Sequence, residues 1–183
     1  MTDVCQPPAP TLPQPPPTWS HTPSSILSLT KDAIDSTRAL HDQIASLSPS
    51  SRSFASVILP LAAAEARLES VAEPLSFYQN VALDKALRDA SNEAEVLLRD
   101  FGVEASMRVD VYEAVKGAAE AVEKEGGTLG AEEKRLIKEM VRDGKRAGLA
   151  LPEEERKVLM EVGGIFLRLV SWNANGCWSS WWV

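Results

Sequence analysis

Apolar residues recur at helical intervals from residue 22 to residue 161, and this spacing constrains the fold more than any other feature of the sequence. Side chains three, four or seven positions apart share one face of an α-helix, whereas a half-buried strand alternates strictly. No stretch of this range alternates in that way. Thr22 is a suitable N-cap residue for the first helix, and Pro23 suits its first position. That helix is expected to end before Pro49, and its apolar face contains Ile26, Leu29, Ile34, Leu40, Ile44 and Leu47.

Prolines and glycines divide the following pattern into two helices. The first is expected to end at Pro74 and to have a kink or a later start at Pro60, because proline cannot donate a backbone hydrogen bond. Its apolar face contains Phe54, Val57, Ile58, Leu61, Ala64, Leu68 and Val71. The next pattern keeps one face over residues 83–122, with weak points at Gly102 and Gly117. It predicts one very long helix, ~60 Å if straight.

Two shorter helices are expected in the last third of the helical range. Residues 131–147 form one of them, and Gly148 suits the position just after its end. Its terminal charges suit the helix dipole, acidic at the start and basic at the end: Glu132, Glu133, Lys145 and Arg146. Pro152 starts another helix that runs to about Glu161. The sequence therefore predicts an all-α fold, an antiparallel helical lobe of about five helices with one very long helix.

Composition changes at both ends of the helical range, which predicts three segments. Residues 1–21 are rich in proline and are expected to be a disordered tail, and their PxxP spacing also fits an SH3-type groove. Residues 22–162 form the helical lobe. Residues 163–183 hold four of the five tryptophans and a single charged residue, Arg168. Two interpretations of this last segment stay open: an aromatic anchor at a membrane interface, or a tail without an evolved role.

Charge and cysteine usage narrow the class of protein. The chain has 19 Lys and Arg against 26 Asp and Glu, a formal charge of −7, which excludes nucleic acid as an expected partner because phosphates attract cations. Cys5 and Cys177 lie far apart without a paired motif and are expected to be free thiols. The N-terminus lacks a secretory or transit pattern, and the longest uncharged apolar stretch is much shorter than the ~18 residues of a membrane span. We therefore expect a cytoplasmic protein and disfavour a membrane partner.

A search for catalytic chemistry finds no complete motif. A zinc peptidase motif needs two imidazoles one helical turn apart, but the two histidines, His21 and His41, are widely separated. Neither a Gly-x-Ser-x-Gly elbow nor a phosphate-binding loop is present. The sequence thus predicts no catalytic residue, no cofactor-binding residue and no metal ligand in this chain. The mixed charges of the third helical pattern are interpreted as a solvated face: Asp84, Lys85, Arg88, Asp89, Glu93, Glu95 and Arg99.

Three stretches have a specific order of residue types. Residues 84–112 read DKALRDASNEAEVLLRDFGVEASMRVDVY, residues 144–152 read GKRAGLALP, and residues 19–23 read WSHTP. The first resembles the long N-terminal helix of the thimet oligopeptidase, neurolysin and saccharolysin family. The second, together with the helix from Arg135, is similar to the family's next helix and its exit loop, and the third resembles the start of the saccharolysin branch. The resemblance covers about residues 18–162.

The resemblance implies the early part of an almost entirely helical zinc metalloendopeptidase that cleaves short peptides, with zinc as the cofactor of the full-length family. The family's zinc motif comes much later in its sequence, and nothing in this chain matches it. The leading hypothesis is therefore a truncated oligopeptidase that is inactive alone. The alternative is a non-enzymatic helical module that binds a partner or a membrane through its terminal segments. Self-association through apolar helix faces is a further expectation.

Overall fold

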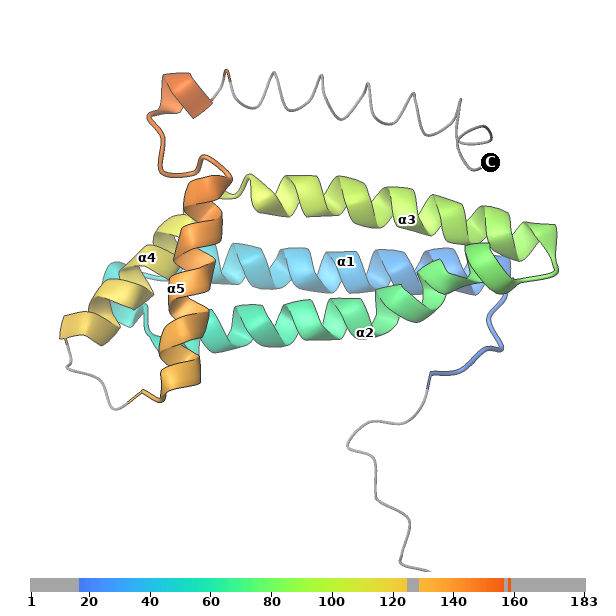
Figure 1. The fold of residues 1–183 in the computed structure, drawn as a ribbon, viewed down its shortest axis with the longest axis horizontal. Coiled ribbons are helices and arrows are strands. Elements are labelled where there is room, and N and C mark those ends of the chain that lie inside the picture. Colours follow the sequence, from blue (N-terminus) through green and yellow to red (C-terminus); the bar gives the residue numbers. More distant parts are fainter. Residues whose placement is uncertain (1–16, 125–128, 157, 159–183) are drawn as a thin grey trace, which may run out of the picture.

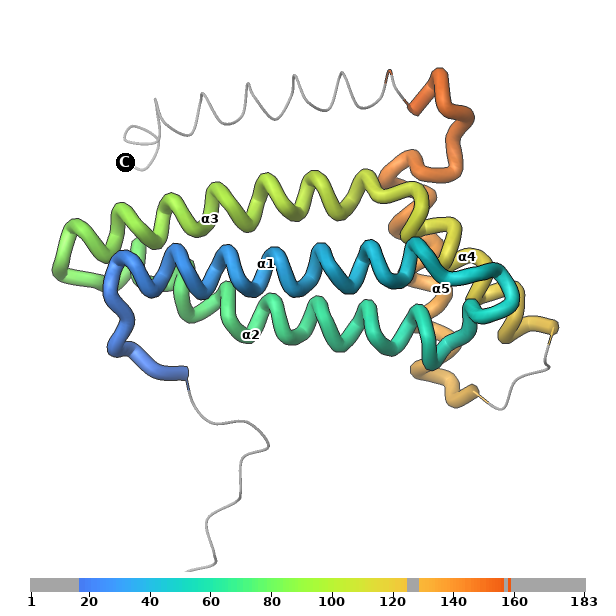
Figure 2. The backbone as a smooth tube through the Cα atoms, turned by 180° about the vertical axis from the view of Figure 1, so that it is seen from behind, coloured from blue at the N-terminus to red at the C-terminus, as the bar shows by residue number. Residues whose placement is uncertain are grey.

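Helices make up the computed structural model, which describes residues 17–124, 129–156 and 158 (Figure 1). These residues contain no strand, and the predicted all-α fold is confirmed. Three long helices lie side by side: α1 (Pro23–Ala45), α2 (Leu59–Val81) and α3 (Lys85–Ser106). Two further helices pack across one end of these three, as Figure 2 also shows from behind: α4 (Val109–Lys124) and α5 (Ala131–Arg146). Two short elements join α1 to α2: η1 (Pro49–Ser51) and η2 (Phe54–Ile58).

The start of α1 agrees with the prediction, with Thr22 as N-cap and Pro23 in the first turn. Thr22 Oγ1 accepts a hydrogen bond from the backbone N–H of Ser25 (3.2 Å), and Ser25 Oγ accepts one from the N–H of Thr22 (2.8 Å). This reciprocal pair satisfies backbone donors that have no partner within the helix. The helix ends at Ala45, before Pro49, as the sequence predicts.

Replacement of Thr22 by alanine is expected to lower the free energy of unfolding by about 1 kcal/mol, because the N–H of Ser25 loses its acceptor. Urea unfolding followed by far-UV circular dichroism measures this change. Thr22→Ser keeps the hydroxyl and serves as the matched control, with an expected change within about 0.5 kcal/mol. Equal losses in the two variants would mean that the hydroxyl does not cap α1.

The second helix is longer than the sequence indicates. η2 is a π-helical turn that continues directly into α2, so residues 54–81 form a joined helix of 28 residues. Pro60, where the sequence predicts a kink or a later start, directly follows the π-helical turn, and within the joined helix its missing N–H costs one backbone hydrogen bond. The prediction that this helix ends at Pro74 is wrong, because Pro74 lies inside α2. Leu75 and Tyr78, which follow it, are buried against α1 and α3, and this packing outweighs the hydrogen bond that proline cannot make.

The single helix predicted over residues 83–122 consists of two helices in the structure. α3 ends at Ser106 and α4 begins at Val109, whereas the predicted weak points, Gly102 and Gly117, both lie within helices. A straight continuation would carry the apolar face of α4 past the ends of α1 and α2 into solvent. The turn between α3 and α4 instead places this face in a core cluster with Ile44, Val57, Ile58, Leu61, Ala114, Val115, Ala118 and Ile137.

The charges at the two ends of α5 and the glycine that follows the helix agree with the prediction. Its first turn is acidic and its last turn is basic, as predicted. Gly148 has φ 82°, the left-handed conformation expected of a glycine just after a helix. Helical backbone resumes at Glu153, and the N–H of Arg156 donates to the carbonyl of Pro152 (3.0 Å). The end predicted for this helix, near Glu161, lies outside the described residues.

The predicted terminal segments fall mostly outside the described residues, since residues 1–16 and 159–183 are not among them. The described residues of the proline-rich segment contact α2. The backbone N–H of His21 donates to the hydroxyl of Tyr78 (3.3 Å), and the ring of Trp19 lies 5.6 Å from that of Tyr78. Trp19 and His21, which the sequence assigned to the disordered tail, therefore lie against the last turns of α2.

Candidate functional site

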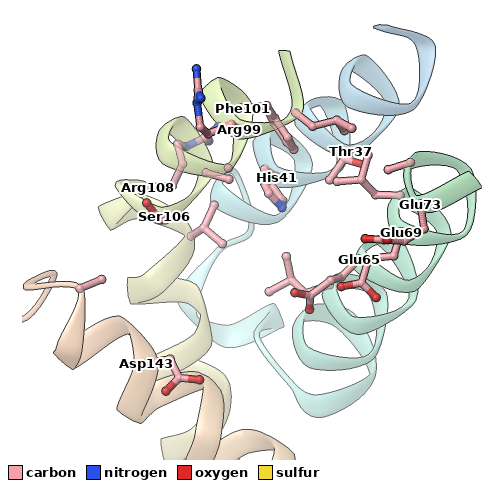
Figure 3. Close-up of a pocket in the computed structure, with 18 of the residues that line it drawn as sticks. Thr37, His41, Glu65, Glu69, Glu73, Arg99, Phe101, Ser106, Arg108 and Asp143 are labelled. Atoms are coloured by element: carbon pink, nitrogen blue, oxygen red, sulfur yellow. The ribbon is translucent and has the colours of Figure 1, made fainter. Parts of the chain in front are cut away.

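An elongated groove of about 950 Å³ lies between the long helices. α2 and α3 form its two walls, α1 lies between them at the bottom, and α4 and α5 line one end (Figure 3). Its surface is mainly apolar, with buried or half-buried side chains that include Leu61, Leu68, Leu98, Phe101, Val111 and Met140. Because all five helices contribute side chains, the groove exists only in the assembled fold.

Three glutamates form a row along the α2 wall. Glu65, Glu69 and Glu73 follow one another at intervals of one helical turn, and all three line the groove (Figure 3). Within the described residues, none of the three carboxylates forms an ion pair. Like charges at this spacing destabilise an isolated helix by ~0.2–0.5 kcal/mol per pair. This glutamate row therefore favours a positively charged group in the groove.

His41 extends from α1 into the groove. Its ring stacks on that of Phe101, with centroids 6.1 Å apart and planes 17° apart. Burial lowers the pKa of His41, and the positive charge of Arg108 lowers this pKa further. Both effects favour the neutral form of the imidazole. A neutral imidazole has one donor and one acceptor nitrogen, so His41 can hydrogen-bond an occupant of the groove without adding charge.

Arg108, which lines the groove, and Arg38, which lies on α1 outside its lining, both pair with carboxylates. The guanidinium of Arg108 donates to Asp42 (2.7 Å) and, through two hydrogen bonds of 2.8 Å, to Asp110. The hydrogen bonds from Arg108 hold the pKa of Asp110 below its usual value. Arg38 makes the same two-bond contact with Glu104, at 2.9 Å for each bond. These pairs join α1 to α3 and to the start of α4. The groove is also lined by two charged residues of α3: Glu95, and Arg99, which lies 3.9 Å from Asp100.

Tyr112 and Gly144 close the α4 and α5 end of the groove. Tyr112 is 4% exposed, and its ring lies against Gly144 so closely that a Cβ at residue 144 would be 2.3 Å from Cδ2 of the tyrosine. The hydroxyl of Tyr112 has no hydrogen-bond partner among the described residues. An unpaired buried hydroxyl costs ~1–3 kcal/mol, so this end of the groove retains an unused donor and acceptor.

Comparison with curated proteins relates this helical assembly to a family. No protein-family model matches the chain. The chain is 29% identical to saccharolysin of Saccharomyces cerevisiae over 154 residues, which cover 84% of this chain and 21% of that protein. It is 30% identical to a probable thimet oligopeptidase of Arabidopsis thaliana over 79% of this chain and 20% of that protein. The chain is a distant homologue of these oligopeptidases. The family resemblance inferred from the sequence is confirmed.

The homology concerns a limited part of an oligopeptidase. A thimet-like oligopeptidase of Dictyostelium discoideum is 28% identical over 61% of this chain, but over only 17% of its own length. The chain thus spans about one fifth of the length of the curated relatives it matches. Among the described residues, no helix is both long enough and apolar enough to cross a membrane.

The described residues do not fit the zinc site that the resemblance implies for the full-length family. His41 lies in the groove, whereas His21 lies near the start of α1, where its Nδ1 is 3.0 Å from the hydroxyl of Tyr78. Within residues 17–124 and 129–156, no three His, Cys, Asp or Glu side chains gather as a metal-binding group. No reaction step through a metal follows from the residues that the structure describes.

The interpretation of the mixed charges on α3 as a solvated face holds for Asp84, Lys85, Asp89 and Glu93, whereas Glu95 and Arg99 line the groove. Asp84, Asp89 and Glu93 are exposed, and Lys85 pairs with Asp89 at 2.5 Å. The groove itself was not predicted. The regular spacing of the glutamate row is visible in the sequence. The opposite wall comes from α3, and only the tertiary structure shows that α3 faces this row.

Proposed function

We propose that this chain forms the helical N-terminal part of a zinc metalloendopeptidase of the oligopeptidase type, and that it does not cleave peptides by itself. The observation that carries the proposal is the extent of the sequence match to saccharolysin. The match covers 84% of this chain but only 21% of saccharolysin. The lack of a metal-binding group among the described residues also supports a structural role. In this role the helices wall a space for short peptides, while other residues carry the reaction.

The paired arginines support a scaffold role because they fix the angles between helices. Arg108 ties the turn between α3 and α4 to Asp42 of α1, and Arg38 ties α1 to Glu104 of α3. Such partly exposed pairs contribute only ~0–1 kcal/mol each to stability. The two-bond geometry of the Arg38–Glu104 pair nevertheless favours one orientation of α1 and α3, which is what a wall of fixed shape requires.

The purified chain is expected to show no zinc-dependent cleavage of a short quenched-fluorescent peptide. Its rate should equal that of the buffer with zinc, because the described residues offer no group that can hold the metal. The Dictyostelium thimet-like oligopeptidase, assayed on the same peptide, is the positive control. A His41→Ala variant separates intrinsic activity from a contaminant. Chelator-sensitive turnover that is lost in this variant would overturn the proposal.

A further inference from the structure

A second groove lies between α4 and α5. It has a volume of about 690 Å³, and no residue lines both this groove and the one between the long helices. Four apolar side chains line it, all of them buried or half-buried: Ala119, Val122, Ile137 and Val141. All four belong to the core cluster of α4 and α5 or pack against it. The second groove is therefore a separate surface, at the end of the molecule where α4 and α5 lie (Figure 1).

The charges that line the second groove are mainly positive, and we call this groove the basic cleft. Four exposed cationic side chains line it from α5: Lys134, Lys138, Arg142 and Lys145. Glu123 of α4 is the one carboxylate among its described lining residues. Arg142 pairs with Glu139 and Asp143, whereas none of the three lysines forms an ion pair within the described residues. Like charges one helical turn apart repel each other, so the basic cleft favours a partner that carries carboxylates.

The chain itself carries a surface of the opposite sign. The glutamate row of α2 is exposed, and its three carboxylates form no ion pair within the described residues. The other charged side chains that line the groove between α2 and α3 each have a hydrogen-bond or ion-pair partner: Glu95, Arg99, Arg108 and Asp143. The glutamate row therefore favours cations, and the three lysines of the basic cleft are cations that favour carboxylates.

The two surfaces also match in spacing. Residues 65, 69 and 73 repeat every four positions along α2, and residues 134, 138 and 142 do the same along α5, a rise of ~6 Å per step. Two helices that lie side by side can therefore place opposite charges at successive turns. Ala62 and Ala66, three positions before Glu65 and Glu69, lie beside the glutamate row. Because these side chains are small, α2 can approach the alanine and valine side chains of the basic cleft closely.

We propose that the basic cleft of one copy of this chain binds the glutamate row of a second copy. Two different surfaces meet in this contact, so it is heterologous, and each copy offers both of them. A nucleic acid fits the basic cleft less well, because no described aromatic side chain lines it for bases to stack on. A bilayer also fits it less well, because the apolar side chains of the cleft are buried or half-buried in a concave surface. The proposal concerns association between copies and is independent of peptide cleavage.

Charge reversal on either surface tests this contact in the full chain. Analytical ultracentrifugation measures the association of the parent as its concentration rises. Lys134→Glu/Lys138→Glu and Glu65→Lys/Glu69→Lys are each expected to raise the dissociation constant at least about tenfold, because two attractive charge pairs become repulsive. An ionic strength of about 1 M, where the screening length is ~3 Å, should weaken the association of the parent as well. The four substituted side chains are exposed, and far-UV circular dichroism checks that each variant keeps its helices.

An equal mixture of the two charge-reversed variants shows whether these two surfaces contact each other. Each variant alone is expected to be a monomer at concentrations where the parent associates. In the mixture, the unaltered glutamate row of the lysine variant meets the unaltered basic cleft of the glutamate variant, so association is expected to return. Reversal of one surface alone cannot identify the surface that it contacts, whereas the return of association in the mixture does.

Matched charge changes outside both surfaces are the controls. Lys31→Glu/Lys85→Glu and Asp32→Lys/Glu93→Lys alter exposed positions of α1 and α3 that line neither groove, and they should leave the dissociation constant unchanged. A parent that stays monomeric up to about 1 mM would overturn the proposal. Association that survives both charge reversals and high salt would mean that copies meet through apolar surfaces instead, and this would also overturn it. Loss of association in only one of the two variants, or a mixture that stays monomeric, would do the same.

Discussion

Replacement of Gly144 by alanine is expected to lower the free energy of unfolding by about 1–3 kcal/mol, the usual cost of an extra group in a packed site. The added Cβ would lie 2.3 Å from Cδ2 and 2.5 Å from Cε2 of Tyr112. Neither residue moves easily, because Gly144 lies within α5 and the tyrosine is buried in α4. The loss is expected even though alanine is the better helix former by ~1 kcal/mol. Urea denaturation monitored by far-UV circular dichroism measures it.

Gly102 provides the matched control for this substitution. It also lies within a helix, but a Cβ added there meets nothing within 4 Å. Gly102→Ala is therefore expected to raise stability by up to ~1 kcal/mol. Replacing the ring by the smaller leucine side chain in Tyr112→Leu should remove most of the stability loss caused by Gly144→Ala. A double-mutant cycle detects this as a coupling energy. A stability gain in both glycine variants would contradict the close approach of α4 and α5.

The features that the sequence predicted correctly depend on neighbours within one or two helical turns. The cap at Thr22 needs only Ser25, and Gly148 needs only the preceding turn of α5. The apolar spacing that predicted the all-α fold is likewise a property of single helices. These features were predictable because local hydrogen bonds and backbone preferences decide them, and the rest of the protein does not oppose them.

The features that the sequence missed depend on contacts between distant segments. α2 continues through Pro74 because residues beyond it pack on α1 and α3, and no local pattern reports that packing. α3 ends at Ser106 because the face of α4 belongs to a cluster with η2 and α5. The groove was missed for the same reason. Glu69 and Leu98 are 29 positions apart in the sequence, and only the folded chain brings them to one surface.

Replacement of Leu75 by alanine is expected to lower the free energy of unfolding by about 2–5 kcal/mol, because the site cannot collapse fully around the smaller side chain. Leu75 is 1% exposed and packs in the cluster that joins α1, α2 and α3 at the end opposite α4 and α5. Its neighbours in that cluster include Ile26 of α1 and Ala94 of α3. Urea unfolding of the variant and the parent, analysed with a common m-value, measures the loss.

Leu83→Ala is the control. This side chain lies in the connection between α2 and α3 and is 99% exposed. Its loss should change the free energy of unfolding by less than about 0.5 kcal/mol. The pair also tests whether α2 continues through Pro74. If the helix ended at Pro74, Leu75 would lie in a connecting segment, and its truncation would cost no more than that of Leu83. A loss of about 2 kcal/mol or more would instead mean that packing beyond Pro74 supplies the energy that keeps α2 continuous.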